Sequence, residues 1–144
     1  MKKDFTCVGS VYLLLIKDNK ILLGRRFKTG FMDGFYGVPA GHIENAETAK
    51  EGCARETKEE IGIDIKPEDL EVVHVMYRDN KKDVRVDFFM TTKSYKGEIK
   101  NCEPHKCDGL DWFDLDNLPD NTIDFMKAGI ENYRNNITYS EFGW

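Results

Sequence analysis

The alternation of apolar and polar residues predicts a chain built mainly of short β-strands. From Val84 to Thr92, aliphatic and aromatic side chains alternate with Arg85 and Asp87, which is typical of a strand with one buried face. An Asp18-Asn19 turn separates two apolar runs and predicts a hairpin between them. Strands are predicted over Phe5–Ile16, Lys20–Gly24, Tyr36–Val38, Leu70–Tyr77, Val84–Thr92 and Gly109–Phe113.

Two segments have the spacing of amphipathic helices instead. Ala46–Ile61 is rich in helix formers, and Gly62 stands where a helix-terminating glycine is expected. Asn45 is the predicted N-cap, because its side chain can accept a hydrogen bond from a free backbone N–H. A second helix is predicted over Ile123–Arg134. Its core-facing positions are Phe125, Met126, Ile130 and Tyr133.

The order of these elements predicts an α/β fold. Strands on either side of one central helix, followed by a terminal helix, indicate a mixed sheet covered on both faces, an α/β/α sandwich. The chain contains no internal repeat, no low-complexity stretch and no linker rich in Pro or Ser. Residues 1–144 are therefore interpreted as a single domain.

Length and charge narrow the classes of function. The 144 residues carry 21 Lys and Arg against 26 Asp and Glu, a net charge of −5, which disfavours binding to polymeric nucleic acid. No run of about 18 apolar residues is present to predict a membrane span. The apolar run at Val11–Ile16 is too short for a signal peptide, so a cytoplasmic location is expected.

The four cysteines are expected to be free thiols in a reducing compartment. Cys102 and Cys107 bracket His105, which leaves zinc binding open as an alternative. Structural zinc usually takes four ligands from two paired clusters, and the sequence has no second cluster of this kind. Buried or half-buried thiols are therefore favoured over a zinc site.

The acidic residues are concentrated just before and along the first predicted helix. On a helix that advances about 100° per residue, Glu56, Glu59 and Glu60 fall on one arc. Like charges at this spacing repel one another, so the arrangement favours a bound cation. Clustered carboxylate oxygens suit Mg²⁺ or Mn²⁺. A solvated acidic face neutralised by Arg55 and Lys58 is the alternative for three glutamates alone.

The residues around the cluster favour the cation. A Gly-Val-Pro-Ala-Gly loop, Gly37–Gly41, leads toward the helix, and such a loop can bring a backbone carbonyl close to a ligand. Gly52 lies on the same arc as the glutamates. It is interpreted as leaving room for a ligand to approach, at a helix-propensity cost of about 1 kcal/mol.

This segment resembles the signature of the Nudix hydrolases, G-x5-E-x7-R-E-U-x-E-E-x-G-U, in which U is usually aliphatic. The matching residues are Gly41, Glu47, Arg55, Glu56, Glu59, Glu60, Gly62 and Ile63. Every fixed position matches, and the one departure is Thr57 at a U position, where the threonine methyl can still face the core. The preceding loop also resembles the family's, with Ala40 where many members have glycine.

The resemblance implies hydrolysis of a nucleoside diphosphate linked to another moiety, with Mg²⁺ or Mn²⁺ as cofactor. By family position, the metal ligands are Glu56, Glu59, Glu60 and the carbonyl oxygen of Ala40. Glu59 and Glu60 are expected to be required for catalysis, and Arg55 to orient the carboxylates with support from Glu47. Divalent cations between phosphate and carboxylate oxygens remove their repulsion and stabilise charge on the leaving phosphate.

By the same resemblance, the general base is expected on a later loop. Glu103, in the segment Cys102–Cys107, is the candidate for the base or for an additional metal ligand. Related members often have a second glutamate where this chain has His105. His105 is a lesser candidate base, because imidazole titrates near neutral pH. A surface loop without a catalytic role is the alternative for both residues.

Substrate contacts are predicted around the glycine-rich loop. Arg25 and Arg26 can pair with phosphate oxygens, and a pair of solvated strand-end charges is the alternative. Phe35 is one of several loop aromatics that could stack on a base or pack in the core. Asn121 could bond a base edge or stabilise a turn before the second helix.

The first hypothesis is metal-dependent hydrolysis of a nucleoside triphosphate, including an oxidised or non-standard one, to monophosphate and pyrophosphate. The alternatives are an ADP-ribose-like nucleotide-sugar pyrophosphatase and a nucleotide-binding module without catalysis. The intact set of Glu56, Glu59 and Glu60 disfavours the binding module. A small-molecule nucleotide is the expected partner, and a homodimer is compatible with the resemblance because the family's members are often dimers.

Overall fold

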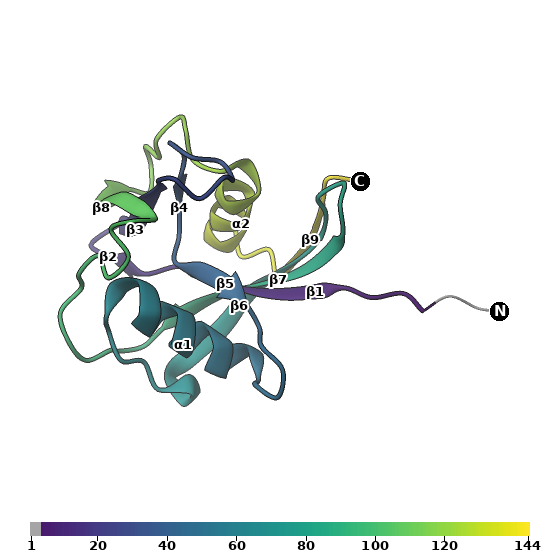
Figure 1. The fold of residues 1–144 in the computed structure, drawn as a ribbon, viewed down its shortest axis with the longest axis horizontal. Helices are drawn as coiled ribbons and strands as arrows, with labels where there is room; N and C mark the ends of the chain where they lie inside the picture. The colour runs from purple at the N-terminus through teal and green to yellow at the C-terminus, as the bar shows by residue number, and fades with distance from the viewer. Residues whose placement is uncertain (1–3) are drawn as a thin grey trace.

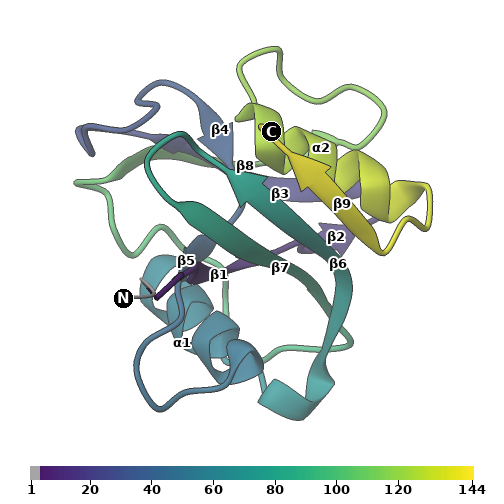
Figure 2. The same ribbon diagram turned by 90° about the vertical axis from the view of Figure 1, so that its right-hand side faces the viewer.

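A five-stranded mixed sheet forms the centre of the computed structural model, which describes residues 4–144 (Figure 1, Figure 2). The order of its strands is β5-β1-β7-β6-β9. Strand β1 pairs with β7 in parallel and with β5 in antiparallel orientation. The strands are β1 (Val8–Leu13), β5 (Ala40–His42), β6 (Leu70–Asp79), β7 (Val84–Thr92) and β9 (Tyr139–Phe142).

A second, smaller sheet is built around β3, which pairs antiparallel with β2, β4 and β8. Its strands are β2 (Ile16–Lys17), β3 (Lys20–Arg26), β4 (Tyr36–Gly37) and β8 (Cys107–Asp114). The prediction of one strand over Phe5–Ile16 is wrong, because β1 belongs to the first sheet and only β2 forms the hairpin with β3. Leu14 and Leu15 carry the chain from one sheet to the other.

Helices α1 (Ala49–Ile61) and α2 (Asp124–Arg134) lie on opposite faces of the five-stranded sheet (Figure 1). The core is divided accordingly, because successive side chains of a strand point to opposite faces. Val11 and Leu13 of β1 pack in the cluster that contains Cys53 of α1. Tyr12 packs in the other cluster, with Met126 of α2. The predicted α/β fold with a mixed sheet covered on both faces is confirmed.

The start of α1 differs from the sequence prediction. The N-cap is Thr48, whose side chain accepts a hydrogen bond from the Glu51 N–H at 3.1 Å, while the Glu51 carboxylate accepts one from the Thr48 N–H at 2.8 Å. This is a capping box. Ala46 has a φ of 66°, outside the helical region, so Asn45 is not the cap. The predicted end is confirmed, since Gly62 adopts a φ of 79° and donates to the Lys58 carbonyl.

Further short elements were not predicted. Strands β5 and β9 are the two edge strands of the five-stranded sheet, and a 3₁₀ turn, Pro67–Asp69, precedes β6. In α2, the predicted core positions are buried except for Tyr133, which is half-buried against the same cluster. All four cysteines are free, and Cys53 is buried. Neither helix in residues 4–144 combines the length and apolarity needed to cross a membrane.

Candidate active site

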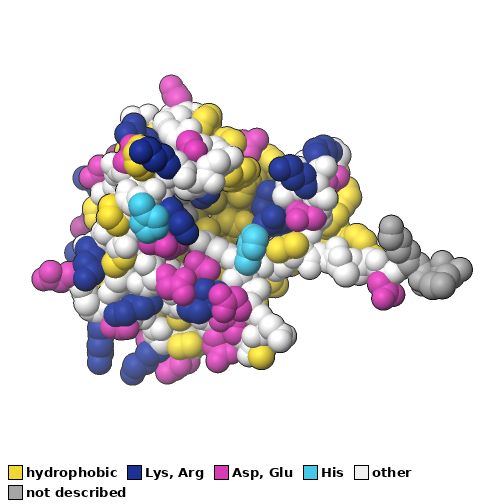
Figure 3. Space-filling model, in the orientation of Figure 1, with side chains coloured by type: hydrophobic (Ala, Val, Ile, Leu, Met, Phe, Trp, Pro, Cys, Tyr) yellow, Lys and Arg dark blue, Asp and Glu magenta, His cyan; other side chains and the backbone are white. Residues whose placement is uncertain are grey.

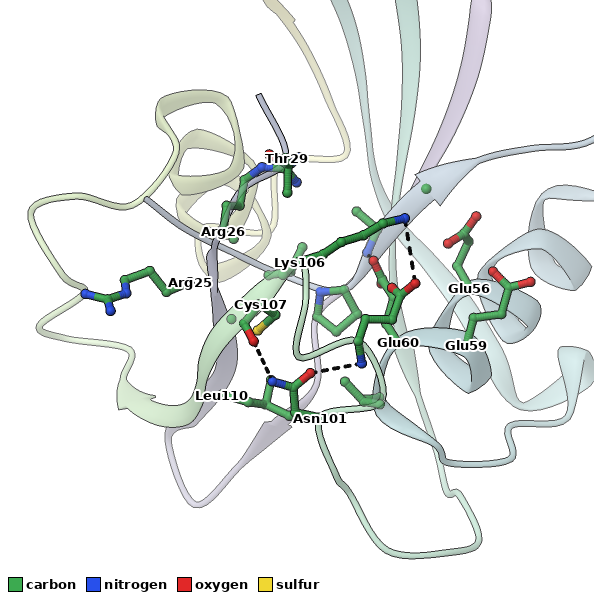
Figure 4. Close-up of a pocket in the computed structure, with 18 of the residues that line it drawn as sticks. Arg25, Arg26, Thr29, Glu56, Glu59, Glu60, Asn101, Lys106, Cys107 and Leu110 are labelled. Atoms are coloured by element: carbon green, nitrogen blue, oxygen red, sulfur yellow. Dashed lines mark hydrogen bonds and ion pairs between the residues drawn. The ribbon is translucent and has the colours of Figure 1, made fainter. Parts of the chain in front are cut away.

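One face of α1 brings its glutamates next to β5. Cys53, Thr57 and Ile61, four residues apart, are buried against the core, as the helical spacing predicts. The neighbouring arc carries Glu56 and Glu60, together with the more exposed Glu59. Figure 4 shows all three carboxylates on the side of α1 that faces the open pocket.

The pocket lies between the two sheets and has a volume of about 520 Å³. It appears on the surface as a hollow with a hydrophobic floor (Figure 3). Its wall is contributed by the end of β3, the β4–β5 segment, α1 and the loop before β8. The side chains with polar or charged groups in that wall are Arg25, Arg26, Thr29, His42, Glu56, Glu59, Glu60, Asn101, Glu103 and Lys106.

Glu60 is the most deeply placed of the three glutamates. Its carboxylate accepts a hydrogen bond from the Ala40 N–H at 2.9 Å. Burial, opposed by that hydrogen bond but assisted by the negative charges of Glu56 and Glu103, raises the pKa of the Glu60 carboxyl to about 8. A carboxylate in this setting is stabilised by any cation that enters the pocket.

Glu56 is held against β5 by a glycine. A Cβ atom on Gly41 would overlap the Glu56 carboxyl group, so only glycine allows this approach. Burial raises the pKa of Glu56, and the Arg55 guanidinium opposes this shift. Gly41, the first glycine of the signature, is therefore required for a steric reason in this chain.

Arg55 links the acidic side chains to one another. Its guanidinium donates to Glu47 at 2.8 and 3.0 Å, to Glu56 at 2.9 Å and to Glu59 at 3.3 Å. It also donates to the His42 carbonyl at 3.0 Å. Hydrogen bonds from Arg55 hold the pKa of Glu47 down at about 2. This geometry is the one that an orienting residue needs.

Gly52 makes room for a side chain and not for a ligand. A Cβ atom at this position would lie 2.9 Å from Glu47 Oε1. The Glu47 carboxylate passes over Gly52, accepts from the Glu44 N–H at 2.7 Å and reaches Arg55. The interpretation of Gly52 as leaving room for a ligand is thus corrected. Glu47 also lies before the helix, because α1 begins at Ala49 and not at the predicted Ala46.

The carboxylates do not form a ready-made metal cage. Among residues 4–144, no group of three His, Cys, Asp or Glu side chains is close enough together to hold a metal ion as it stands. The donor chemistry nevertheless fits a hard cation, because the half-buried Glu56 and the more deeply placed Glu60 bring carboxylate oxygens to one pocket wall. Mg²⁺ takes only a few protein oxygens and completes its shell with water and phosphate oxygens.

The loop before β8 places Glu103 in the same pocket as the glutamates of α1. Asn101 fixes this loop, since its side-chain oxygen accepts from the Glu103 N–H at 3.1 Å and its amide donates to the Cys107 carbonyl at 2.6 Å. Lys106 Nζ lies 3.9 Å from the Glu103 carboxylate. His105 is exposed and lies outside the pocket wall.

The two arginines at the end of β3 have different surroundings. Arg25 is engaged by Asp108 through two hydrogen bonds of 2.7 and 2.8 Å, and in Figure 4 it points away from the glutamates. Arg26 donates to the Phe31 carbonyl at 2.6 Å and to Thr29 at 3.1 Å, and it lines the pocket without a carboxylate partner among residues 4–144.

The other two predicted substrate contacts lie beside the pocket. Phe35 is on the glycine-rich loop, 36 % exposed, and is not part of the pocket wall. Asn121 donates to the Gly34 carbonyl at 2.7 Å and so ties that loop to the segment before α2. Their contact with substrate stays a prediction.

Several wall residues were missed by the sequence reasoning. Thr29, His42, Asn101 and Lys106 reach the pocket from segments that are far apart in the chain. Asn101 and Lys106 flank Glu103 closely, so the prediction of Glu103 could have drawn attention to them. Nothing in the local pattern distinguishes Thr29 or His42.

Known proteins with related sequences are enzymes of one family. An ADP-ribose pyrophosphatase of Methanocaldococcus jannaschii is 32 % identical over 114 residues, 79 % of this chain. The chain spans 66 % of the length of that relative, just under two thirds. An 8-oxo-dGTP diphosphatase of Proteus vulgaris is 31 % identical over 83 residues, 58 % of this chain and 72 % of the relative.

The structural comparison agrees in fold. The crystal structure of a MutT NUDIX hydrolase from Burkholderia pseudomallei superimposes with a TM-score of 0.79 at 24 % identity, covering 88 % of this chain and 97 % of the other. The family model described as NUDIX domain matches residues 8–133, which include α1 and the whole pocket wall. Because this family model covers most of the chain, and the fold and related sequences agree with it, the chain belongs to the Nudix family of hydrolases.

Proposed function

We propose that the chain hydrolyses a nucleoside triphosphate, including one with an oxidised or non-standard base, to a monophosphate and pyrophosphate. The observation that carries this proposal is the acidic wall of the pocket, where Glu56, Glu59 and Glu60 face a space bounded by Arg26 and Lys106. Carboxylates alone repel phosphate, so this wall suits a substrate that arrives with divalent cations. The 8-oxo-dGTP diphosphatase among the relatives supports a triphosphate.

Nudix hydrolases generally use a divalent metal, and Glu56, Glu59, Glu60 and the carbonyl of Ala40 would hold Mg²⁺ or Mn²⁺ here. When bound, such an ion neutralises phosphate charge and acidifies water. The donor on which this assignment depends most is Glu60, whose raised pKa reflects a buried carboxyl without a full countercharge.

The remaining steps belong to residues of the chain. A water molecule adds to a phosphorus of the pyrophosphate linkage, the bridging P–O bond breaks, and the monophosphate leaves. Glu103 would take the proton from that water, and its position in the wall of the same pocket supports this role. Arg55 keeps Glu56 and Glu59 in place through the hydrogen bonds described above.

A nucleotide-sugar pyrophosphatase is the second candidate. The ADP-ribose pyrophosphatase among the relatives favours it, and the same acidic wall would serve the same phosphorus chemistry. A binding module without catalysis is disfavoured, because all three glutamates are present and Arg55 pairs with two of them, Glu56 and Glu59.

A substrate panel tests the proposal. Natural and oxidised nucleoside triphosphates, ADP-ribose and other nucleotide sugars are incubated with Mg²⁺, and the products are identified by chromatography. We expect monophosphate and pyrophosphate in a 1:1 ratio from at least one triphosphate, and no turnover when EDTA removes the metal. Preferential release of a sugar phosphate would favour the nucleotide-sugar pyrophosphatase. The absence of product from every substrate would contradict the proposal that the chain is a pyrophosphatase.

A further inference from the structure

The loop that carries Glu103, residues 101–107, is attached to the body of the protein at both ends. Near its start, the Cys102 N–H donates to the Glu60 carbonyl at 3.0 Å, which satisfies a carbonyl that the last turn of α1 leaves free. Near its end, the Lys106 carbonyl accepts from the Phe27 N–H at 2.9 Å, just after β3. The Glu103 loop therefore bridges α1 and β3 along the wall of the pocket.

The charge of Glu103 makes a further restraint necessary. Its carboxylate shares the pocket with Glu56, Glu59 and Glu60, and like charges repel one another more strongly where water is partly excluded. Lys106 is paired with Glu103 at 3.9 Å, but the lysine side chain is 59 % exposed. An exposed pair of this kind contributes little. The backbone of the loop is what can keep Glu103 beside the other carboxylates.

The side chain of Asn101 ties the loop to itself (Figure 4). Its oxygen accepts from the Glu103 N–H at 3.1 Å, and its nitrogen donates to the Cys107 carbonyl at 2.6 Å. The Glu103 carbonyl in turn accepts from the N–H groups of Lys106 and Cys107 at 2.9 and 3.0 Å. The backbone of Glu103 is thus held on both sides, through its N–H and through its carbonyl.

Asn101 lines the pocket itself, so direct contact with the substrate is the competing role. Both ends of its amide group are already bonded to the backbone of the loop. One amide hydrogen and one lone pair of the oxygen remain for other partners. A test must therefore separate an effect through Glu103 from an effect on the substrate.

We propose that Asn101 is a positioning residue, which holds Glu103 at the pocket wall and acts on the reaction through Glu103 alone. This inference rests on the proposed function, because it requires a reaction in which Glu103 takes a proton. Asparagine side chains stabilise turns by bonding the backbone two residues ahead, as Asn101 does here. Without that bond, repulsion displaces Glu103, and a displacement of about 1 Å can cost about a hundredfold in rate.

A double-mutant cycle tests this role. For Asn101→Ala we expect kcat to fall roughly tenfold to a hundredfold, with KM changed less than about threefold. Glu103→Gln should lower kcat by at least about a hundredfold. Asn101→Ala added to Glu103→Gln should cost less than about threefold more, because the carboxylate that Asn101 positions is already lost.

Two further variants complete the cycle. Asn101→Ser keeps a hydroxyl that can accept from the Glu103 N–H, although more weakly than an amide does. Its kcat should lie between those of the original chain and of Asn101→Ala. Asn117→Ala is the control and should retain activity, because Asn117 is exposed and lies outside the pocket wall.

The outcomes separate this inference from the proposed function. If a substrate is hydrolysed but Asn101→Ala costs the same factor with and without Glu103→Gln, the inference is wrong and the proposed function stands. A rise in KM with unchanged kcat would assign Asn101 to substrate binding and would also overturn the inference.

Amide hydrogen exchange covers a protein that hydrolyses no substrate of the panel, an outcome that would itself overturn the proposed function. The Glu103 N–H should exchange roughly threefold to tenfold faster in Asn101→Ala than in Asn117→Ala. The Cys102 N–H, which is bonded to the Glu60 carbonyl, should exchange equally in both variants. Equal exchange of the Glu103 N–H would contradict the positioning role without any reference to catalysis.

Discussion

At the scale of single residues, the acidic wall depends on positions that allow close contact. Gly41 admits the Glu56 carboxyl, Gly52 admits Glu47, and Arg55 bonds both carboxylates. The sequence motif identified Gly41, Glu47, Arg55 and Glu56, and the helical arc drew attention to Gly52. The spatial reasons for these residues became clear only in the structure. Gly52 is the instructive one, since its small size serves Glu47 and not a ligand.

Gly41→Ala should impair activity more than stability. The added methyl group collides with Glu56 and displaces its carboxylate, so we expect kcat to fall at least about tenfold, since small errors in position are costly in catalysis. Gly109→Ala is the control, because the nearest atom to a Cβ there is 4.0 Å away. Steady-state kinetics and thermal melting of both variants check this, and unchanged kinetics in Gly41→Ala would contradict the placement of Glu56.

Other residues of the site could not be predicted. Thr29 and His42 reach the pocket wall from a loop and from β5, and nothing in their local sequence marks them. The glutamates of α1 were predictable because one helical turn brings them together. The general rule is that a site within one element is visible in sequence, whereas a site between elements requires the fold.

At the scale of elements, the start of α1 can be tested by comparing two candidate N-cap residues, Thr48 and Asn45. Thr48→Ala removes the side-chain oxygen that satisfies the Glu51 N–H, and it should lower the free energy of unfolding by about 1 kcal/mol. Asn45→Ala, at the cap predicted from sequence, should change it by less than about 0.5 kcal/mol. Urea denaturation of both variants measures the difference, and a larger effect at Asn45 would contradict the observed start of the helix.

A buried ion pair joins β6 to β7 beneath α2. Arg78 and Asp87 are nearly inaccessible, and the Tyr12 hydroxyl donates to Asp87 at 2.9 Å. Asp87→Asn leaves the guanidinium without its countercharge, and we expect a loss of about 3–5 kcal/mol. Asp83→Asn, which disrupts the more exposed pair with Arg85, should cost about 1 kcal/mol or less. Urea denaturation measures both losses. Similar losses of unfolding free energy in Asp87→Asn and Asp83→Asn would contradict the claim that burial makes the Arg78–Asp87 pair more costly to break.

The elements themselves were predictable to the extent that their cues are local. Gly62 ends α1 through its own backbone conformation, and the run Val84–Thr92 correctly predicts β7. The prediction of one buried face in this run is wrong, because both faces of β7 are covered and Asp87 is fully buried. Strands β5 and β9 escaped prediction because each is short and is defined by pairing with a distant strand. The division of Phe5–Ile16 between two sheets is likewise a property of the partners and not of the segment.

At the scale of the whole molecule, the net charge of −5 conceals two opposite regions. Acidic side chains border one end of the hollow and basic side chains the other (Figure 3). A surface divided in this way suits a polyphosphate with bound cations better than a surface of uniform charge would. The expectation that polymeric nucleic acid is disfavoured depends on the net charge alone, and the net charge does not reveal this local division.

Divalent cations should stabilise the folded protein. Mg²⁺ at about ten times its dissociation constant adds about 1.4 kcal/mol, which corresponds to a rise of roughly 3–6 °C in Tm for a chain of this size. The rise should be reversed by EDTA and be smaller in Glu60→Gln, because that variant loses a proposed ligand. Differential scanning fluorimetry measures it, and an equal rise in Glu60→Gln would place the cation elsewhere.

The most direct test of the central claim is the turnover number of Glu60→Gln with Mg²⁺ and the best substrate of the panel. We expect kcat to fall by at least about a hundredfold, with no loss of thermal stability in EDTA because the buried carboxyl is replaced by a neutral amide. Glu71→Gln, an exposed position on β6, is the matched control and should retain activity. A Glu60→Gln enzyme with kcat within about threefold of the original would contradict the acidic wall of α1 as the catalytic centre.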